Sequence, residues 1–208
     1  GDFMEASQAF ESASYLKSSR GVWIDSIAYH AMAGECLYHM GNLDAALQRY
    51  NTALRIYLQY PDWLTKIKIP GALKPSARAG RRGPIWGASS RAVRVAQIPD
   101  RMAMTVGKSN EANAKAIEEG GIVQRRYMVM VDAKEIVRCT ALAIRRRAEI
   151  LGPAGEYDSL TSQLITQLSR RPAPAGSWAQ AWVGVQLGLA YASKRKTDEA
   201  VAQLKSSL

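Results

Sequence analysis

Apolar residues between positions 23 and 60 recur with the period of an α-helix. The segment from 23 to 40 places the small pair Ala33-Gly34 where a neighbouring helix would cross, and Gly41 ends it. A stripe spaced i, i+3, i+4, i+7 follows, formed by Leu43, Ala46, Leu47, Tyr50, Ala53, Leu54 and Tyr57. Pro61 limits this second stripe. The pattern predicts two antiparallel helices joined by a tight turn.

The same pattern occurs elsewhere in the chain. Gly1, Asp2, Phe3, Ala6, Phe10 and Ala13 share the spacing of Gly41, Asn42, Leu43, Ala46, Tyr50 and Ala53, 40 residues later. Near the other end, a second helix pair is indicated by the order L-G-x-x-Y, then A-x-x-x-L, with residues 196–199 as the turn; its members are Leu187, Gly188, Tyr191, Ala200 and Leu204. Between these two regions the sequence indicates a degenerate helix pair. Its signs are an apolar stripe from 137 to 151, a turn at 155–158, and Leu160 and Leu164 after the turn.

These marks resemble the tetratricopeptide repeat family, whose pattern is W-x-x-L-G-x-x-Y followed by A-x-x-x-F. The positions that carry the resemblance, and that we expect to pack the repeats, are Gly34, Leu37, Ala46, Tyr50, Leu187, Gly188, Tyr191 and Ala200. Departures include His30 or Gly184 at the Trp position and Arg195 at the turn Gly. The 40-residue spacing also exceeds the usual period of about 34. The resemblance implies an all-α superhelix of helix-turn-helix repeats.

A start in the middle of a repeat leads us to expect a fragment of a longer array. The family resemblance implies a concave surface, lined by the first helix of each pair, that receives a peptide or helix from a protein partner. Residues 30, 34 and 37 and residues 184, 188 and 191 fall on such first helices. Specific ligand contacts and the oligomeric state stay open.

A long insertion separates the two helical parts, so we expect helices in 1–63, a basic insertion in 64–126 and helices in 127–208. Pro and Gly between positions 70 and 99 exclude a long helix before about Met102. A short helix is expected over 110–119, capped by Ser109 or Asn110. Residues 122–131 alternate, which fits either an extended segment or the start of the next helix.

The excess of positive charge is concentrated in the insertion. Of the formal charge of +10, residues 64–126 contribute 13 basic and four acidic side chains, a net +9. Candidate contacts to an anion or partner are Arg78, Arg81, Arg82, Trp86, Arg91 and Arg94. Binding of nucleic acid is one reading, but single-strand binders interleave several aromatic residues rather than one Trp. The interpretation we favour is an ordered loop, anchored by its aliphatic residues across the helices.

No residue pattern indicates catalysis, a metal or a cofactor. The Gly107-Lys108-Ser109 fragment lacks the first glycine of a phosphate-binding loop. Cys36, Cys139 and His30 are expected in the core, and zinc is not expected.

Three consecutive arginines, residues 145–147, would fan over about 300° of a helix and cannot converge on one anion. We interpret them as a solvated flank, so that Arg146→Ala is expected to be silent whereas Ala46→Trp is expected to damage the fold.

No apolar run approaches the roughly 18 to 20 residues needed to cross a bilayer, so membrane insertion is not expected and the cytoplasm is the expected compartment. The sequence predicts a non-catalytic scaffold for protein interactions. Two alternatives remain: a nucleic-acid-binding module that uses the basic insertion, and an accessory region of a larger multidomain enzyme.

Overall fold

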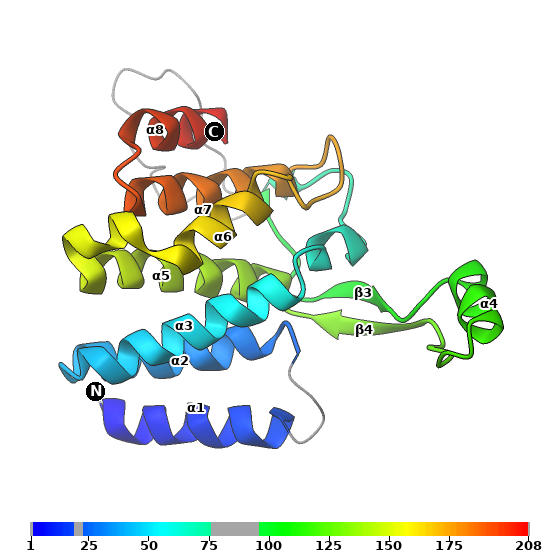
Figure 1. Cartoon of the computed structure of the whole chain (residues 1–208), viewed down its shortest axis with the longest axis horizontal. Helices are drawn as coiled ribbons and strands as arrows, with labels where there is room; N and C mark the ends of the chain where they lie inside the picture. Colours follow the sequence, from blue (N-terminus) through cyan, green and yellow to red (C-terminus); the bar gives the residue numbers. More distant parts are fainter. Residues whose placement is uncertain (1, 19–22, 76–95, 208) are drawn as a thin grey trace.

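The computed structural model describes residues 2–18, 23–75 and 96–207, and these residues form a mostly helical protein (Figure 1). The α-helices within them are α1 (Phe3–Ser18), α2 (Ser26–His39), α3 (Leu43–Gln59), α4 (Asn110–Glu118), α5 (Ala133–Leu151), α6 (Ser159–Leu168), α7 (Ala179–Ser193) and α8 (Thr197–Ser206). Two 3₁₀ turns, η1 (Trp63–Lys66) and η2 (Gly152–Tyr157), follow α3 and α5. The predicted helical class is confirmed. No helix in the described ranges is long and apolar enough to span a membrane.

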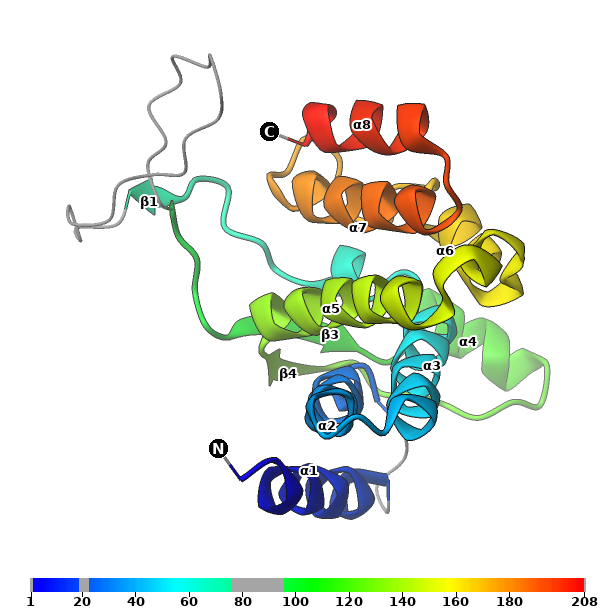
Figure 2. The ribbon, with the colours of Figure 1, turned by 90° about the vertical axis from the view of Figure 1, so that its left-hand side faces the viewer.

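The helices stack in layers along the molecule. Figure 2 shows α1 at one end, then α2 and α3, then α5, then α6 and α7, and α8 at the other end. One hydrophobic core runs through the inner layers, formed by α2, α3, α5, α6 and α7, and extends from Ile24 to Ala190. The largest buried side chains include Tyr50 and Tyr57 of α3 and Ile136 of α5. Each interior helix therefore packs on both sides, which explains why α3 and α5 carry wide apolar faces.

Side-chain caps determine where several helices begin. Asn42 accepts a hydrogen bond from the Ala45 backbone N–H (3.3 Å) at the start of α3. The carboxylates of Asp132 and Asp158 cap α5 and α6 in the same way, with acceptor distances of 2.9 and 2.6 Å. Each cap satisfies a backbone N–H that has no partner within its own helix.

An arm projects from the helical stack between α3 and α5 (Figure 1). Strands β3 (Met102–Val106) and β4 (Tyr127–Val131) pair antiparallel, with Met102 opposite Val131 and Val106 opposite Tyr127. Helix α4 lies at the far end of this hairpin. The amide of Asn113 fastens α4 to the hairpin, because it donates to the carbonyls of Lys108 and Gln124 and accepts from the Gln124 N–H.

The near end of the hairpin is tied to the helices. Met102, Met104 and Val131 are buried in the core, and Ile67 forms an isolated bridge to Met104. A second antiparallel pair has only two residues in each strand: β1 (Lys74–Pro75), which follows η1, and β2 (Ala96–Gln97), which precedes β3.

The expected cap at Ser109 and the short helix after it are confirmed. The Ser109 hydroxyl accepts a hydrogen bond from the Ala112 N–H (3.2 Å) at the start of α4.

The pairing of β3 with β4 decides the question left open for residues 122–131. Residues 127–131, expected within the second helical part, are a strand of the hairpin. Its partner β3 was not foreseen, because Met102–Val106 contains two Met and an Ala rather than a β-branched run. Of the ordered loop expected within the insertion, Ile67, Ile69 and Ile98 pack in or against the core, whereas residues 76–95 lie outside the described residues.

The interpretation of Arg145, Arg146 and Arg147 as one solvated flank is wrong for two of the three. The Arg145 side chain is 65% exposed, as expected, and it pairs with Glu149. Arg146 is only 17% exposed and Arg147 only 5% exposed, and both make ion pairs to acids on other elements. Neighbouring helices cover these two positions of α5, so polar partners within the protein replace water around their charges.

Candidate binding pocket

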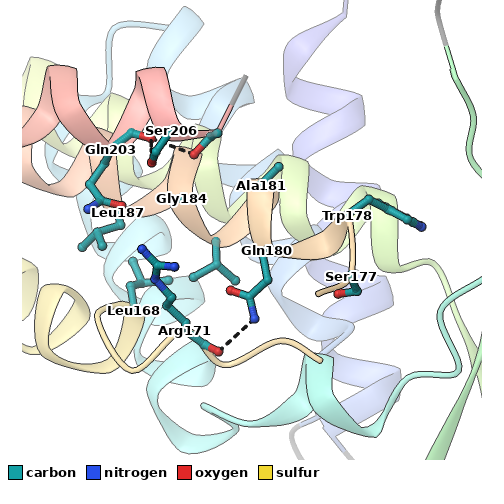
Figure 3. Close-up of a pocket in the computed structure, with 12 residues that line it drawn as sticks. Leu168, Arg171, Ser177, Trp178, Gln180, Ala181, Gly184, Leu187, Gln203 and Ser206 are labelled. Atoms are coloured by element: carbon teal, nitrogen blue, oxygen red, sulfur yellow. Dashed lines mark hydrogen bonds between the residues drawn. The ribbon is translucent and has the colours of Figure 1, made fainter. Parts of the chain in front are cut away.

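A pocket of about 350 Å³ opens between α7, α8 and the connection from α6 to α7 (Figure 3). It is lined by Leu168, Arg171, Ser177, Trp178, Gln180, Ala181, Val183, Gly184, Leu187, Gln203, Ser206 and Ser207. Apolar side chains form its floor, and polar groups stand around its rim.

Helix α7 supplies one wall through helical periodicity. Gln180, Val183, Gly184 and Leu187 are spaced so that they share one face. Gly184 leaves room between α7 and α8, since a β-carbon there would collide with the Ser207 hydroxyl. That hydroxyl donates to the Gln203 carbonyl (2.8 Å) and stays at the pocket edge. A side chain at position 184 would therefore require the Ser207 side chain to move.

Arg171 provides the positive charge. Its backbone is in the left-handed region, with φ of +50°, and its guanidinium extends across the pocket toward α7 (Figure 3). An arginine in this conformation is uncommon, because the β-carbon crowds the following carbonyl. The turn directs the side chain back over the pocket rather than away from the protein.

The Gln180 amide is only partly satisfied. Its Nε2 donates to the Ala173 carbonyl (2.6 Å), with the Arg171 and Pro174 carbonyls at 3.4 Å. Its Oε1 is shielded from solvent, and no donor reaches it from the described residues. A buried acceptor without a donor is costly unless a bound group supplies one. The pocket thus combines a guanidinium and serine hydroxyls above an apolar floor, and the shielded Gln180 acceptor is not part of its open surface.

Two tryptophans hold the rim of the pocket in place. Trp178 donates from Nε1 to the Pro70 carbonyl (2.8 Å) and packs edge-on against Trp182, with ring centroids 4.8 Å apart. The first contact joins the start of α7 to the segment after η1. The rim is consequently fixed by contacts between segments far apart in the chain.

The residues expected to pack repeats fall into two separate groups. At α2 and α3, Gly34 lies against Tyr50, and Ala46 is fully buried. At α7 and α8, Gly188 lies against Leu204 and the Ala200 carbonyl. Leu37 and Tyr191 are half-buried, and Leu187 lines the pocket. Helices α5 and α6 separate the groups, so they do not form one site.

The two groups are nevertheless built alike. Gly34 and Tyr50 correspond to Gly188 and Leu204, each 154 residues later. In the first turn the Asn42 N–H donates to the Leu37 carbonyl, and in the second the Lys196 N–H donates to the Tyr191 carbonyl, both at 3.0 Å. Gly41 and Arg195 occupy the same place in these turns, with φ of +78° and +57°.

Sequence reasoning missed the pocket's polar residues. Arg171, Gln180 and Ser206 belong to no motif, and of the residues that line the pocket only Gly184 and Leu187 fall on positions of the repeat pattern. The six candidate contacts of the insertion, Arg78, Arg81, Arg82, Trp86, Arg91 and Arg94, lie outside the described residues. Nothing in the structure therefore bears on them.

A second polar cluster joins α2 to α5. Arg146 donates to both carboxylate oxygens of Glu35 (2.5 and 2.9 Å), bonds Glu149 at 2.8 Å, and lies 4.2 Å from the Tyr38 ring centre. Burial raises the pKa of Glu35, but the hydrogen bonds from Arg146 and Tyr50 outweigh it and bring the pKa below its ordinary value. These charges are compensated, which assigns the cluster to structure rather than chemistry.

The cysteines offer no nucleophile. Cys36 and Cys139 are free and buried. Burial, reinforced by Glu135, raises the pKa of Cys139 to about 12, so the thiol stays protonated at neutral pH. Within the described ranges, no group of three His, Cys, Asp or Glu side chains could hold a metal ion.

No protein-family model, curated protein sequence or solved structure matches this chain.

Proposed function

We propose that this chain is a non-catalytic scaffold of the tetratricopeptide repeat type that binds a short peptide of a partner protein. The peptide places an apolar side chain on Leu168, Val183 and Leu187 and a carboxylate beside Arg171. The observation that carries the proposal is the pocket itself, in which the Arg171 cation stands over an apolar floor.

Two features support the relationship to helical repeats. The turns at Gly41 and Arg195 share three backbone hydrogen bonds, and the close contacts at Gly34 and Gly188 recur with the same offset. Stacked helix pairs of this kind bury a continuous core and leave a surface for extended ligands. The pocket lies on α7, the helix that the resemblance places on such a surface.

Fluorescence anisotropy tests the proposal. The probe is a labelled hexapeptide pool, prepared in three forms: with a free C-terminus, with an amidated C-terminus, and with an internal Asp or Glu. Binding to at least one carboxylate-bearing form is expected. Comparison of the forms tells whether the carboxylate is terminal or in a side chain.

Two substitutions locate the binding. Arg171→Gln removes the charge and Ala181→Trp fills the pocket, and each should weaken binding by about tenfold or more. The control is Arg170→Gln, because Arg170 is the exposed neighbour outside the pocket lining. Equal losses at positions 170 and 171, or no binding of any pool, would show that the pocket is not the peptide site.

Nucleic-acid binding is the second candidate, and the charge of residues 64–126 favours it. Phosphate contacts by these side chains would make affinity fall steeply with salt. Titration of a labelled single-stranded oligonucleotide at two salt concentrations tests this, and absence of binding at low salt would reject it.

A further inference from the structure

Strand β4 has one edge paired with β3 and one edge without a strand partner in the described chain. Its inner edge pairs with β3 over all five residues, and no strand of the described chain lies beside its outer edge. The outer edge of β3 is partly covered, since the Lys68 N–H donates to the Ala103 carbonyl (2.8 Å). An uncovered edge presents backbone donors and acceptors to any strand that approaches it.

The register identifies which backbone groups face outward. Because Ala103 bonds away from β4, its neighbours Met102 and Met104 bond toward β4, to Val131 and Val129. The backbone groups of Met128 and Met130 therefore face the open edge. These two residues are 73% and 59% exposed, which is unusual for large apolar residues.

Opposite charges flank the strand. Arg126 immediately precedes β4, and Asp132 immediately follows it. An antiparallel copy of the same strand, centred on Val129, would place Arg126 opposite Asp132 of the second copy at both ends. It would also pair Met128 with Met130 of that copy through their outward backbone groups. A parallel copy would place like charges opposite each other.

Charge also selects among the antiparallel registers. A centre at Met130 would set Arg126 opposite Lys134, which is unfavourable. A centre at Met128 would leave Asp132 opposite the uncharged Gln124. Only the centre at Val129 pairs both flanking charges and matches the outward backbone groups.

We propose that two copies of this chain dimerise through their arms, with β4 of each pairing antiparallel about Val129 to form a continuous four-stranded sheet. The contact is isologous, so every interaction occurs twice. Addition of a strand to a sheet edge obtains affinity from main-chain bonds, and the methionines and charges provide specificity. This interface lies on the arm, apart from the peptide pocket at α7 and α8, and does not depend on peptide binding.

Sedimentation equilibrium of the 208-residue chain tests the dimer. The wild-type chain should dimerise, whereas Arg126→Glu and Asp132→Lys should each weaken self-association by about tenfold or more, because each places like charges opposite each other. An equimolar mixture of the two variants should form a heterodimer, since both cross-strand pairs are then attractive. A monomeric wild-type chain, or a mixture that stays monomeric, would overturn the proposal.

Two controls separate charge pairing from damage to the fold. Arg125→Glu changes the net charge by the same amount as Arg126→Glu, but position 125 lies opposite Ala133 in this register. This variant should therefore leave the dimer intact. Asp132 also caps α5, so Asp132→Asn retains the cap acceptor while it removes the charge. Its dimer should be weakened less than that of Asp132→Lys. Loss of the dimer in Arg125→Glu equal to that in Arg126→Glu would reject the register.

Discussion

The guanidinium of Arg147 makes a two-pronged ion pair with the carboxylate of Asp158, with Nη2–Oδ1 at 2.9 Å and Nη1–Oδ2 at 3.0 Å. The same guanidinium donates to Asn51 of α3 (2.6 Å) and to the Thr161 hydroxyl of α6 (3.2 Å). One buried cation of α5 thus joins three helices. Forked pairing of this kind adds directional strength to the charge attraction.

The ion pair of Arg147 with Asp158 makes the free energy of unfolding depend on pH. Burial raises the pKa of Asp158, but the hydrogen bonds from Arg147 and Thr161 outweigh it and lower the pKa to about 2. The carboxylate's contribution is therefore complete above its ordinary pKa of about 4 and is lost as pH falls toward 2. Urea unfolding should show Asp158→Asn less stable than wild type at pH 7, and the gap should close toward pH 2. A difference in unfolding free energy that stays constant with pH would contradict this explanation. Asp44→Asn is the control, because Asp44 is exposed.

Arg145 and Arg146 provide a matched pair of neighbours. Arg146→Ala leaves Glu35 without its charged partner and should lower the free energy of unfolding by about 2 kcal/mol. Arg145 is mostly exposed, so Arg145→Ala should change it by less than about 0.5 kcal/mol. Chemical denaturation of both variants measures the difference. Equal effects would mean that the Glu35 contact does not stabilise the fold.

Arg195 occupies a turn position that suits glycine. The backbone φ of Arg195 is +57°, a conformation that costs a residue with a β-carbon roughly 1 to 2 kcal/mol. Glycine adopts this conformation without that cost, but its unfolded state has more conformational entropy, which offsets part of the gain in stability. Arg195→Gly should therefore stabilise the chain by about 0.5 kcal/mol. The reciprocal Gly41→Arg, in the equivalent turn, should destabilise it. Thermal melts that ranked the two variants the other way would contradict the equivalence of the turns.

A substitution at Gly34 tests whether the close contact of α2 with α3 stabilises the chain. A β-carbon at this position would lie 2.8 Å from Cε1 of the buried Tyr50 ring. Gly34→Ala should destabilise the chain by about 1 to 3 kcal/mol, despite the better helix propensity of alanine. Gly71→Ala is the control, because nothing lies within 4 Å of its added β-carbon. A stabilising Gly34→Ala would show that the two helices can move apart without cost.

Local pattern alone was enough for the helices with strong stripes and clear caps. The stripe from Leu43 to Tyr57 corresponds to α3, and the Ser109 cap corresponds to the start of α4. Periodicity and capping depend on residues within about one or two turns of each other, so they are visible along the chain. The same holds for the small residues Gly34 and Gly188, whose spacing from the following turn is short.

Only the tertiary structure decided the partners of residues with identical local character. Arg145, Arg146 and Arg147 are adjacent and chemically the same, yet the first faces solvent and the others meet Glu35 and Asp158. The pairing of β3 with β4 and the gathering of Arg171, Gln180 and Ser206 around one pocket are likewise contacts between separate segments. Sequence by itself determined which segments are helical, because hydrogen bonds within a helix are local. The tertiary structure determined which charges are buried and where the pocket opens, because those depend on how distant segments pack.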